Sequence, residues 1–162
     1  METGGLKCYV LMLSRVFPVN HYRAGSETFF KDALDLGIKI HTIRANYDLW
    51  AKRVQDINDG KAYLSVRQWS DKPYRSKQVE IKQFFKLGIE RISMQLKKHQ
   101  IKWLVQNSTT PYFLHEVASN DGLEYNEFVD WFFPGFDNGE FEGAILHFTD
   151  FRYVDPNKQI QR

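Results

Sequence analysis

The strand patterns of this chain cluster in its middle and do not alternate regularly with helices. Apolar residues alternate over residues 61–69 and 74–85, and these two strand patterns follow each other directly, which predicts a hairpin. Before them, strand patterns over residues 7–16 and 37–44 flank a helical pattern that begins at Ser26. A parallel doubly wound sheet needs the regular alternation that is missing here. We therefore expect an α+β fold, a small mixed or antiparallel β-barrel with helices on its rim.

The second half of the chain adds two helices and a last strand to this pattern. Residues 89–96 fit both a strand and a helical period, and the two alternatives stay open. Helices are predicted from Thr110 and from about Glu124, and a strand over residues 142–153 follows them.

The chain is long enough to bury one core. We predict a single domain over residues 1–162, with its core in residues 7–153 and flexible tails at residues 1–6 and 154–162. Cys8 is the one cysteine of the sequence, which excludes an intramolecular disulfide and a cysteine-based zinc cluster. The five histidines show no metal-ligand spacing, so neither a metal nor another cofactor is expected. No apolar run approaches the ~18 residues of a membrane span, which predicts a cytoplasmic protein without a membrane partner.

Charge and aromatic content narrow the class of ligand. The formal net charge is +2, so any nucleic-acid contact is expected to be a local basic patch rather than a general electrostatic grip on a duplex. Phe, Tyr and Trp make up 15% of the residues. A large aromatic core accounts for most of them, and exposed rings that stack on bases are the functional alternative. We assign Trp50, Trp103 and Trp131 to the core.

Residues 37–44 form a short strand pattern with more polar groups than a structural strand needs, namely Lys39, His41, Thr42 and Arg44. On a regular strand, Thr42 and Arg44 point the same way as the two isoleucines before them, which belong in the core. Thr42 is then directed to the interior and Arg44 to its mouth, whereas Lys39 and His41 lie on the opposite face. A Lys39–Thr42 pair therefore requires a bulge or bend, which strands at active sites often contain.

The motif Gly37-x-Lys39-x-x-Thr42-Ile43-Arg44 resembles the signature of the ASCH domains, which are relatives of the PUA-like RNA-binding domains. The resemblance covers roughly residues 9–153, and weaker pieces downstream agree with it. These pieces are Gly60-Lys61 after a Trp-bearing helix, Ser65-Val66-Arg67 leading to Val79-Glu80-Ile81, and Asn120-Asp121-Gly122-Leu123 before Glu127-Phe128.

This resemblance implies a PUA-like pseudobarrel with a cleft and a ligand such as RNA or a modified nucleoside. One enzymatic branch of the family is similar to an amidohydrolase that removes the acetyl group from acetylated cytidine. Lys39 and Thr42 match the lysine and threonine of that branch. Its third catalytic residue is a glutamate in an acidic turn, for which Asp121 is the nearest match and Glu124 a second candidate.

Each of these residues also has a purely structural interpretation. Lys39 is either a solvated lysine or an ammonium that binds phosphate or a carbonyl oxygen, and Thr42 is either a buried hydroxyl or a nucleophile. Arg44 either takes a phosphate or base edge or pairs with an aspartate, Asp48, at the start of the next helix. His41 is either a ligand-facing donor or an incidental outward side chain. Asp121 is either a turn residue or the acid that orients a ligand amino group or polarises Lys39.

The hairpin predicted over residues 61–85 is a second candidate surface. Arg67, Trp69, Tyr74 and Arg75 place cations beside aromatic rings, a pattern that suits single-stranded or loop RNA. The alternative is a solvated hairpin with scattered charges.

Three functions are consistent with these observations. We favour binding of RNA or a modified nucleoside in a cleft. The alternative is an amidohydrolase that acts on an acylated nucleoside such as acetylcytidine, with Thr42 as nucleophile, Lys39 as base and Asp121 as orienting acid. A third is a protein-interaction domain that uses the aromatic surface. The oligomeric state is left open.

Overall fold

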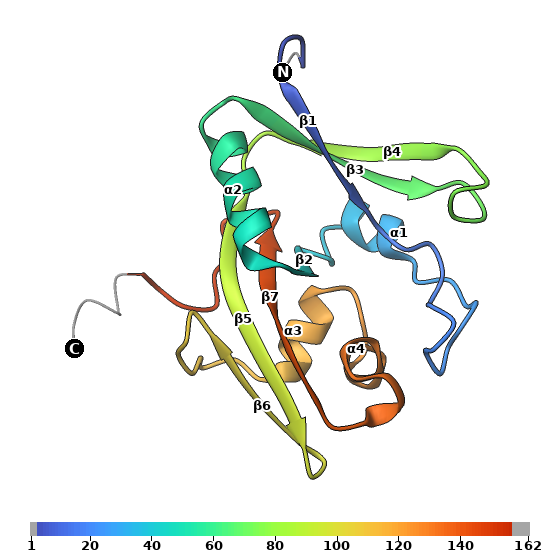
Figure 1. Ribbon diagram of the computed structural model, residues 1–162, viewed down its shortest axis with the longest axis vertical. Coiled ribbons are helices and arrows are strands. Elements are labelled where there is room, and N and C mark those ends of the chain that lie inside the picture. Colours follow the sequence, from blue (N-terminus) through green and yellow to red (C-terminus); the bar gives the residue numbers. More distant parts are fainter. Residues whose placement is uncertain (1–2, 157–162) are drawn as a thin grey trace.

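The computed structural model describes residues 3–156, and over this range it confirms the α+β class (Figure 1). Strands and helices occur in the order β1, α1, β2, α2, β3 to β6, α3, α4 and β7, with a short 3-10 helix before β7. The bounds are β1 Lys7–Met12, α1 Phe30–Asp35, β2 His41–Ala45, α2 Tyr47–Asn58, β3 Ala62–Trp69, β4 Gln78–Phe84, β5 Gly88–Lys97, β6 Gln100–Val105, α3 Leu114–Asn120, α4 Tyr125–Phe132, the 3-10 helix Pro134–Phe136 and β7 Gly139–His147.

The strands form two sheets. A three-stranded sheet has the order β1-β3-β4, with β1 parallel and β4 antiparallel to β3. A four-stranded sheet has the order β2-β7-β5-β6 and is antiparallel throughout. The edge strands of one sheet do not pair with those of the other, so the strands of residues 3–156 do not close into the expected barrel. The ambiguous residues 89–96 belong to a strand, β5.

Helix α2 packs against strands of both sheets, β3 on one side and β5 and β7 on the other (Figure 1). The Asn46 side chain caps its first turn by accepting a hydrogen bond of 3.2 Å from the backbone N–H of Leu49. Trp50, Val54 and Ile57 follow at helical spacing and are buried, so one face of the helix enters the core.

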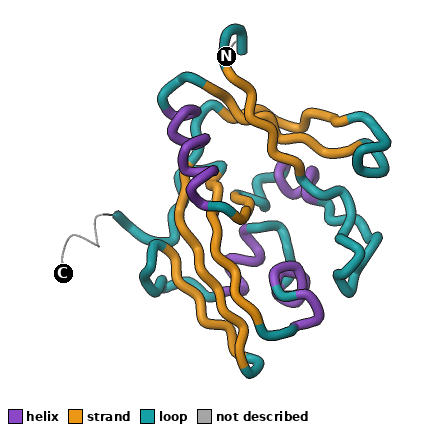
Figure 2. The backbone as a smooth tube through the Cα atoms, in the orientation of Figure 1, coloured by secondary structure: helices purple, strands orange, loops and turns teal. Residues whose placement is uncertain are grey.

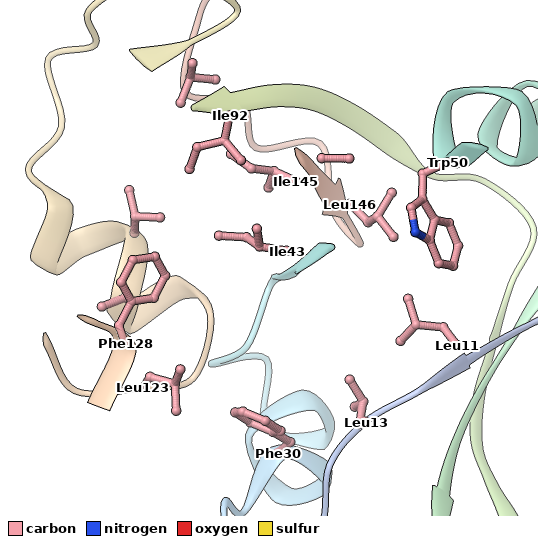
Figure 3. Packing of buried hydrophobic residues seen from close by; sticks show 14 of the residues in the cluster. Leu11, Leu13, Phe30, Ile43, Trp50, Ile92, Leu123, Phe128, Ile145 and Leu146 are labelled. Carbon is pink, nitrogen blue, oxygen red and sulfur yellow. The ribbon is translucent and has the colours of Figure 1, made fainter. Parts of the chain in front are cut away.

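The core lies between the two sheets and the helices, and its side chains come from both halves of the chain (Figure 3). Ile43 of β2 lies in this interior with Ile145 and Leu146 of β7 and with Phe128 of α4. Phe30 of α1 is buried in the same cluster. Burial of such side chains is the main favourable contribution to folding.

Two expected strands begin later than the sequence predicts. The N–H groups of Ile38 and Lys39 both bond to the carbonyl of Ala33, at 2.9 and 3.0 Å, so the chain still curls back on α1 and β2 begins at His41. Tyr74 has a φ of 62°, outside the β region, and β4 begins at Gln78.

The ends of the chain are described in part. Residues 1–2 and 157–162 of the predicted tails lie outside the described residues. Val154, which the sequence places in the C-terminal tail, is held by a bond of 3.0 Å from its N–H to the Glu90 carboxylate. Figure 2 shows a long loop between β1 and α1, which begins beside the site described next. Among the described residues, no helix is long and apolar enough to cross a membrane.

Candidate functional site

The segment that precedes β2 meets the turn that joins α3 to α4. Gly122 in this turn has a φ of 82°, a conformation that favours glycine. A side-chain carbon at this position would lie 3.4 Å from Lys39 Cβ and 3.5 Å from a Phe30 ring carbon. The glycine therefore lets the turn pass directly over the Lys39 side chain, and it places Asp121 beside the Lys39 ammonium.

Lys39 is buried, with 2% of its surface exposed, so the solvated lysine is excluded. Its Nζ donates hydrogen bonds of 3.0 Å to Asp121 Oδ1 and 2.7 Å to the Asp121 carbonyl, and it lies 4.3 Å from the centre of the Phe30 ring. The expectation that Lys39 lies on the face opposite Thr42 is wrong, because β2 has not yet begun at residue 39. The irregular backbone supplies the bend that the pair requires.

Burial sets the protonation of this ion pair. It lowers the pKa of Lys39 below its usual range, and the Asp121 carboxylate opposes part of that shift. Burial alone would raise the pKa of Asp121, but the charge of Lys39 and the nearby His41 ring hold it below its usual range. Asp121 is therefore ionised, as a buried acid that faces two cationic or donor groups should be.

A small cavity of about 50 Å³ lies beside the ion pair. Since one water needs about 10–15 Å³, this volume holds a few waters or a substituent of a few heavy atoms. Ser14, which is exposed, lies at its edge. The wall combines five polar residues with five apolar ones. These are Ser14, Lys39, Thr42, Arg44 and Asp121, and Phe30, Ile43, Leu123, Trp131 and Phe132.

Arg44 lines this cavity without a carboxylate partner in residues 3–156. Its Nη2 donates a bond of 2.6 Å to the carbonyl of Met12, and its buried Nε has no hydrogen-bond partner. The alternative partner, Asp48, lies 3.9 Å from Arg91 instead. Burial lowers the pKa of Arg44, and Asp121 opposes the shift. A buried N–H donor without an acceptor is energetically unfavourable unless a ligand supplies one.

Thr42 is 4% exposed and lines the same cavity. Its hydroxyl makes no hydrogen bond to the described part of the chain, which removes the interpretation of a hydroxyl satisfied by backbone. The structure therefore brings together Lys39, Thr42, Arg44 and Asp121, which are 82 positions apart at their most distant pair, Lys39 and Asp121.

His41 does not line the cavity. It is fully buried rather than outward-facing, and its Nε2 lies 2.6 Å from the hydroxyl of Tyr153. Its Nδ1 lies 3.5 Å from Asp121 Oδ1. His41 thus lies behind the ion pair, where it contacts the carboxylate but is not exposed to a ligand.

The hairpin residues do not line the cavity either. Arg67 donates to Ser65 Oγ at 2.9 Å and to Gln78 Oε1 at 3.0 Å, so it is engaged within the sheet. Trp69 and Tyr74 lie at the hairpin end with ring centroids 5.2 Å apart, and Tyr74 is 89% exposed.

The hairpin nevertheless comes near the mouth of the cavity. Arg75 is exposed on its tip. Asp71, in the turn of the same hairpin, lies 3.6 Å from an Nη atom of Arg15, the neighbour of Ser14. The hairpin and the cavity are therefore separate surfaces, and the Asp71–Arg15 contact links them next to Ser14.

Several wall residues were not predicted from the sequence. Trp131 was assigned to the core but is half-buried at the cavity, and Phe30 looked like an ordinary helix-face residue. Ser14 carried no signal, because it belonged to an expected strand. Glu124, the second candidate acid, caps α4 and is exposed outside the cavity.

Another hollow, of about 570 Å³, lies on β5, β6 and β7, but it has no convergent group of buried charges. Within residues 3–156, no cluster of three or more His, Cys, Asp or Glu side chains has the geometry of a metal site. The small polar cavity is therefore the candidate site, because ionisable groups with shifted pKa values and hydrogen-bond donors without partners both line it.

No family model, no curated protein and no solved structure significantly matches this chain. Function is therefore inferred from the geometry of the cavity and from the sequence motif that lines it.

Proposed function

We propose that the protein binds a modified nucleoside, free or within RNA, and that a polar substituent of the base enters the cavity beside Lys39 and Asp121. The observation that supports this most directly is the guanidinium of Arg44. The residue is half-buried, it lines the cavity, and its Nε is buried and lacks a partner in the described chain. A ligand oxygen that accepts from Nε would satisfy it.

The groups around the cavity define the chemistry of this substituent. Arg44 offers a donor and Thr42 offers a hydroxyl that can donate or accept. Asp121 Oδ1 is shared by Lys39 and His41, whereas Oδ2 accepts no hydrogen bond from residues 3–156. A carbonyl next to an N–H complements this set, and an N-acyl group on a base carries both within the few heavy atoms that the cavity admits.

The sequence motif supports the same class of ligand. Residues 37–44 resemble the ASCH signature, and the motif's lysine, threonine and arginine are the residues that line the cavity. On this proposal, the two sheets are an open form of a PUA-like pseudobarrel. Tyr74 and Arg75, exposed at the tip of the β3–β4 hairpin, then offer a ring and a cation to the RNA around the modified base.

A calorimetric titration with cytidine and with N4-acetylated cytidine tests the proposal. We expect the acetylated nucleoside to bind more tightly, and Arg44→Gln to weaken it by roughly 10- to 100-fold, as the loss of a hydrogen bond from a charged group would. The matched control is Arg75→Gln, which removes the same charge from the hairpin tip. Equal affinity for the two nucleosides, or equal losses in the two variants, would contradict binding in the cavity.

A salt series with short single-stranded RNA separates the two surfaces. Affinity for RNA should fall with salt by a log–log slope of about −0.7 per phosphate contact, whereas affinity for the uncharged nucleoside should not change. Arg75→Gln should reduce the slope and leave nucleoside affinity intact. A slope of zero for RNA would restrict the ligand to free nucleosides.

Amide hydrolysis is a second candidate, favoured by the burial of Lys39 in the same cavity as the unbonded Thr42 hydroxyl. A lysine with a lowered pKa can serve as general base. Neutral Lys39 would take the proton from Thr42 as Oγ attacks the acyl carbon. The C–N bond then breaks, the amine leaves with that proton, and water hydrolyses the threonyl ester to release the carboxylic acid.

Chromatography of acetylated cytidine after incubation with the protein tests this reaction. Cytidine and acetate should appear in equal amounts, and Thr42→Val should abolish them while Arg75→Gln does not. No turnover at high protein concentration would remove the enzymatic candidate and leave the binding proposal standing.

A further inference from the structure

A row of buried polar groups lies behind the cavity and ends at Asp121, and its first two contacts are hydrogen bonds. Asn120 Nδ2 lies 3.0 Å from the Tyr153 hydroxyl, and that hydroxyl lies 2.6 Å from His41 Nε2. His41 Nδ1, on the other side of the ring, lies 3.5 Å from Asp121 Oδ1. Asn120, His41 and Tyr153 do not line the cavity, so the proposed ligand does not account for them.

The donors and acceptors of this row assign its protons. The amide nitrogen of Asn120 can only donate, so the Tyr153 oxygen accepts from it. The phenol proton is then directed to His41 Nε2, which must be the acceptor in that bond. A neutral imidazole carries its proton on the other nitrogen, Nδ1. That N–H faces the Asp121 carboxylate, whereas the opposite tautomer would bring a lone pair against it.

The burial of both rings agrees with this assignment. Burial lowers the pKa of His41, even though Asp121 opposes the shift, so the imidazole is neutral near pH 7. Lys39 also faces His41 and lowers its pKa further. Burial raises the pKa of Tyr153, which keeps the phenol proton in place. Each ring therefore carries one proton near pH 7.

We propose that His41 is a positioning residue for the site, held by Tyr153 and Asn120 in its Nδ1–H tautomer so that its N–H faces Oδ1 of Asp121 and leaves Oδ2 to the ligand. The tautomer stands on the hydrogen bonds alone. The role of the free Oδ2 in ligand binding rests on the proposed function.

A neighbouring histidine supplies an internal control. His147 is the register partner of His41 across β2 and β7, and the two ring centroids are 5.7 Å apart. His147 Nε2 lies 2.7 Å from Glu90 Oε1. Glu90 also accepts from the backbone N–H groups of Tyr153 at 2.8 Å and Val154 at 3.0 Å, which identifies it as an ionised acceptor. His147 must therefore donate from Nε2, so the two histidines have opposite tautomers.

Nitrogen-15 NMR of the imidazole rings tests this assignment, because a protonated ring nitrogen and an unprotonated one have well-separated shifts. At pH 7.5 we expect His41 to be protonated at Nδ1 and His147 at Nε2 in the same sample. Tyr153→Phe should remove the bias of His41 and leave His147 unchanged. An Nε2–H tautomer of His41, or a ring protonated at both nitrogens, would overturn the proposal.

Two substitutions then separate positioning from simple packing. The amide nitrogen of Asn reaches the place of Nδ1, and that of Gln reaches the place of Nε2. His41→Asn should therefore keep the pKa of Asp121, followed by carbon-13 NMR, within a few tenths of a unit of wild type. His41→Gln should raise it by about one unit, a tenfold change in proton affinity. An equal Asp121 pKa in both variants would overturn the positioning role, whatever the affinity for acetylated cytidine.

Discussion

The neighbouring histidines of the four-stranded sheet, His41 and His147, each face a buried carboxylate, Asp121 from the α3–α4 turn and Glu90 from β5, and the surroundings of the two carboxylates differ. Glu90 receives three hydrogen bonds, from His147 and from the N–H groups of Tyr153 and Val154. Asp121 receives bonds from Lys39 on one oxygen and leaves the other oxygen without a partner in residues 3–156. The Glu90 carboxylate is therefore fully engaged within the protein, whereas the Asp121 carboxylate has a free oxygen in the described chain beside a cavity.

This difference indicates that the Glu90 carboxylate stabilises the fold and that the Asp121 carboxylate belongs to a binding site. Buried hydrogen bonds rigidify the structure around them, and here those of Glu90 fasten the segment after β7 to β5. An incomplete network lowers stability unless something else completes it. The site therefore has a partner-free donor, Arg44 Nε, and a free Asp121 oxygen on the wall of a cavity, while the Glu90 carboxylate supports the fold.

The largest effect should come from removing the Glu90 carboxylate. We expect Glu90→Ala to lower the free energy of unfolding by about 3–5 kcal/mol, because His147 and two backbone N–H groups lose their acceptor in the interior. Urea denaturation measures the loss, and hydrogen exchange of the Tyr153 and Val154 amides should accelerate. The matched variant Glu140→Ala, an exposed carboxylate, should stay within about 0.5 kcal/mol of wild type. A similarly small loss for Glu90→Ala would refute the assignment of a fastening role.

Acid should then weaken both pairs in two separate pH ranges. Burial lowers the pKa of His41 and His147, so the unfolded chain binds their protons first. Their contribution is full above an unfolded pKa of about 6.5 and is lost as pH falls below it, by about 1.4 kcal/mol per pH unit for each proton.

The carboxylates follow in the lower range. Burial alone would raise the pKa of Glu90 and Asp121, but hydrogen bonds from His147 to the first and the charge of Lys39 on the second hold both below their usual values. Their contribution is full above unfolded values of about 4 and is lost as pH falls through the folded values. Urea midpoints between pH 7.5 and 3 measure both losses, and a flat profile from pH 7.5 to 5 would contradict neutral buried histidines.

The smallest effect on stability should come from the site itself. Thr42→Val keeps the shape of the side chain and removes a hydroxyl that makes no bond within the described chain, so we expect a change under about 0.5 kcal/mol. The same variant should lose affinity for the acetylated nucleoside. Ser65→Ala is the contrasting control, because that hydroxyl accepts from Arg67 and donates to Glu80, and its loss should cost about 1 kcal/mol. Equal losses in the two variants would show that Thr42 is structural.

The sequence predicted the α+β class and the group of residues around the cavity from local features. Period-2 patterns identified β3 and its hairpin partner, and a short motif drew attention to Lys39, Thr42 and Arg44. The prediction placed Lys39 on the wrong face because it extended a strand through residues that fold back on α1. Hydrogen bonds to a single carbonyl decided this, and they leave no periodic trace in a sequence.

The contributions of His41 and Tyr153 could not be predicted, because they depend on distant pairing. The sequence pattern predicts an outward side chain for His41, because it does not show that β7 pairs with β2. Tyr153, which contacts His41, lies 112 positions away in the sequence. The closure of a barrel is equally non-local, since it depends on how edge strands of two sheets meet. Local sequence patterns predict the helices and strands. The pairing of distant strands determines which of their polar side chains are buried together.

The bond from Arg44 to the carbonyl of Met12 has a mechanical consequence. Arg44 belongs to β2 of the four-stranded sheet, and Met12 ends β1 of the three-stranded sheet. This hydrogen bond therefore links the two sheets beside the site. A ligand that draws the Arg44 side chain toward itself must weaken this hydrogen bond. The measured affinity of the ligand then includes the free energy lost when the link between the sheets is weakened.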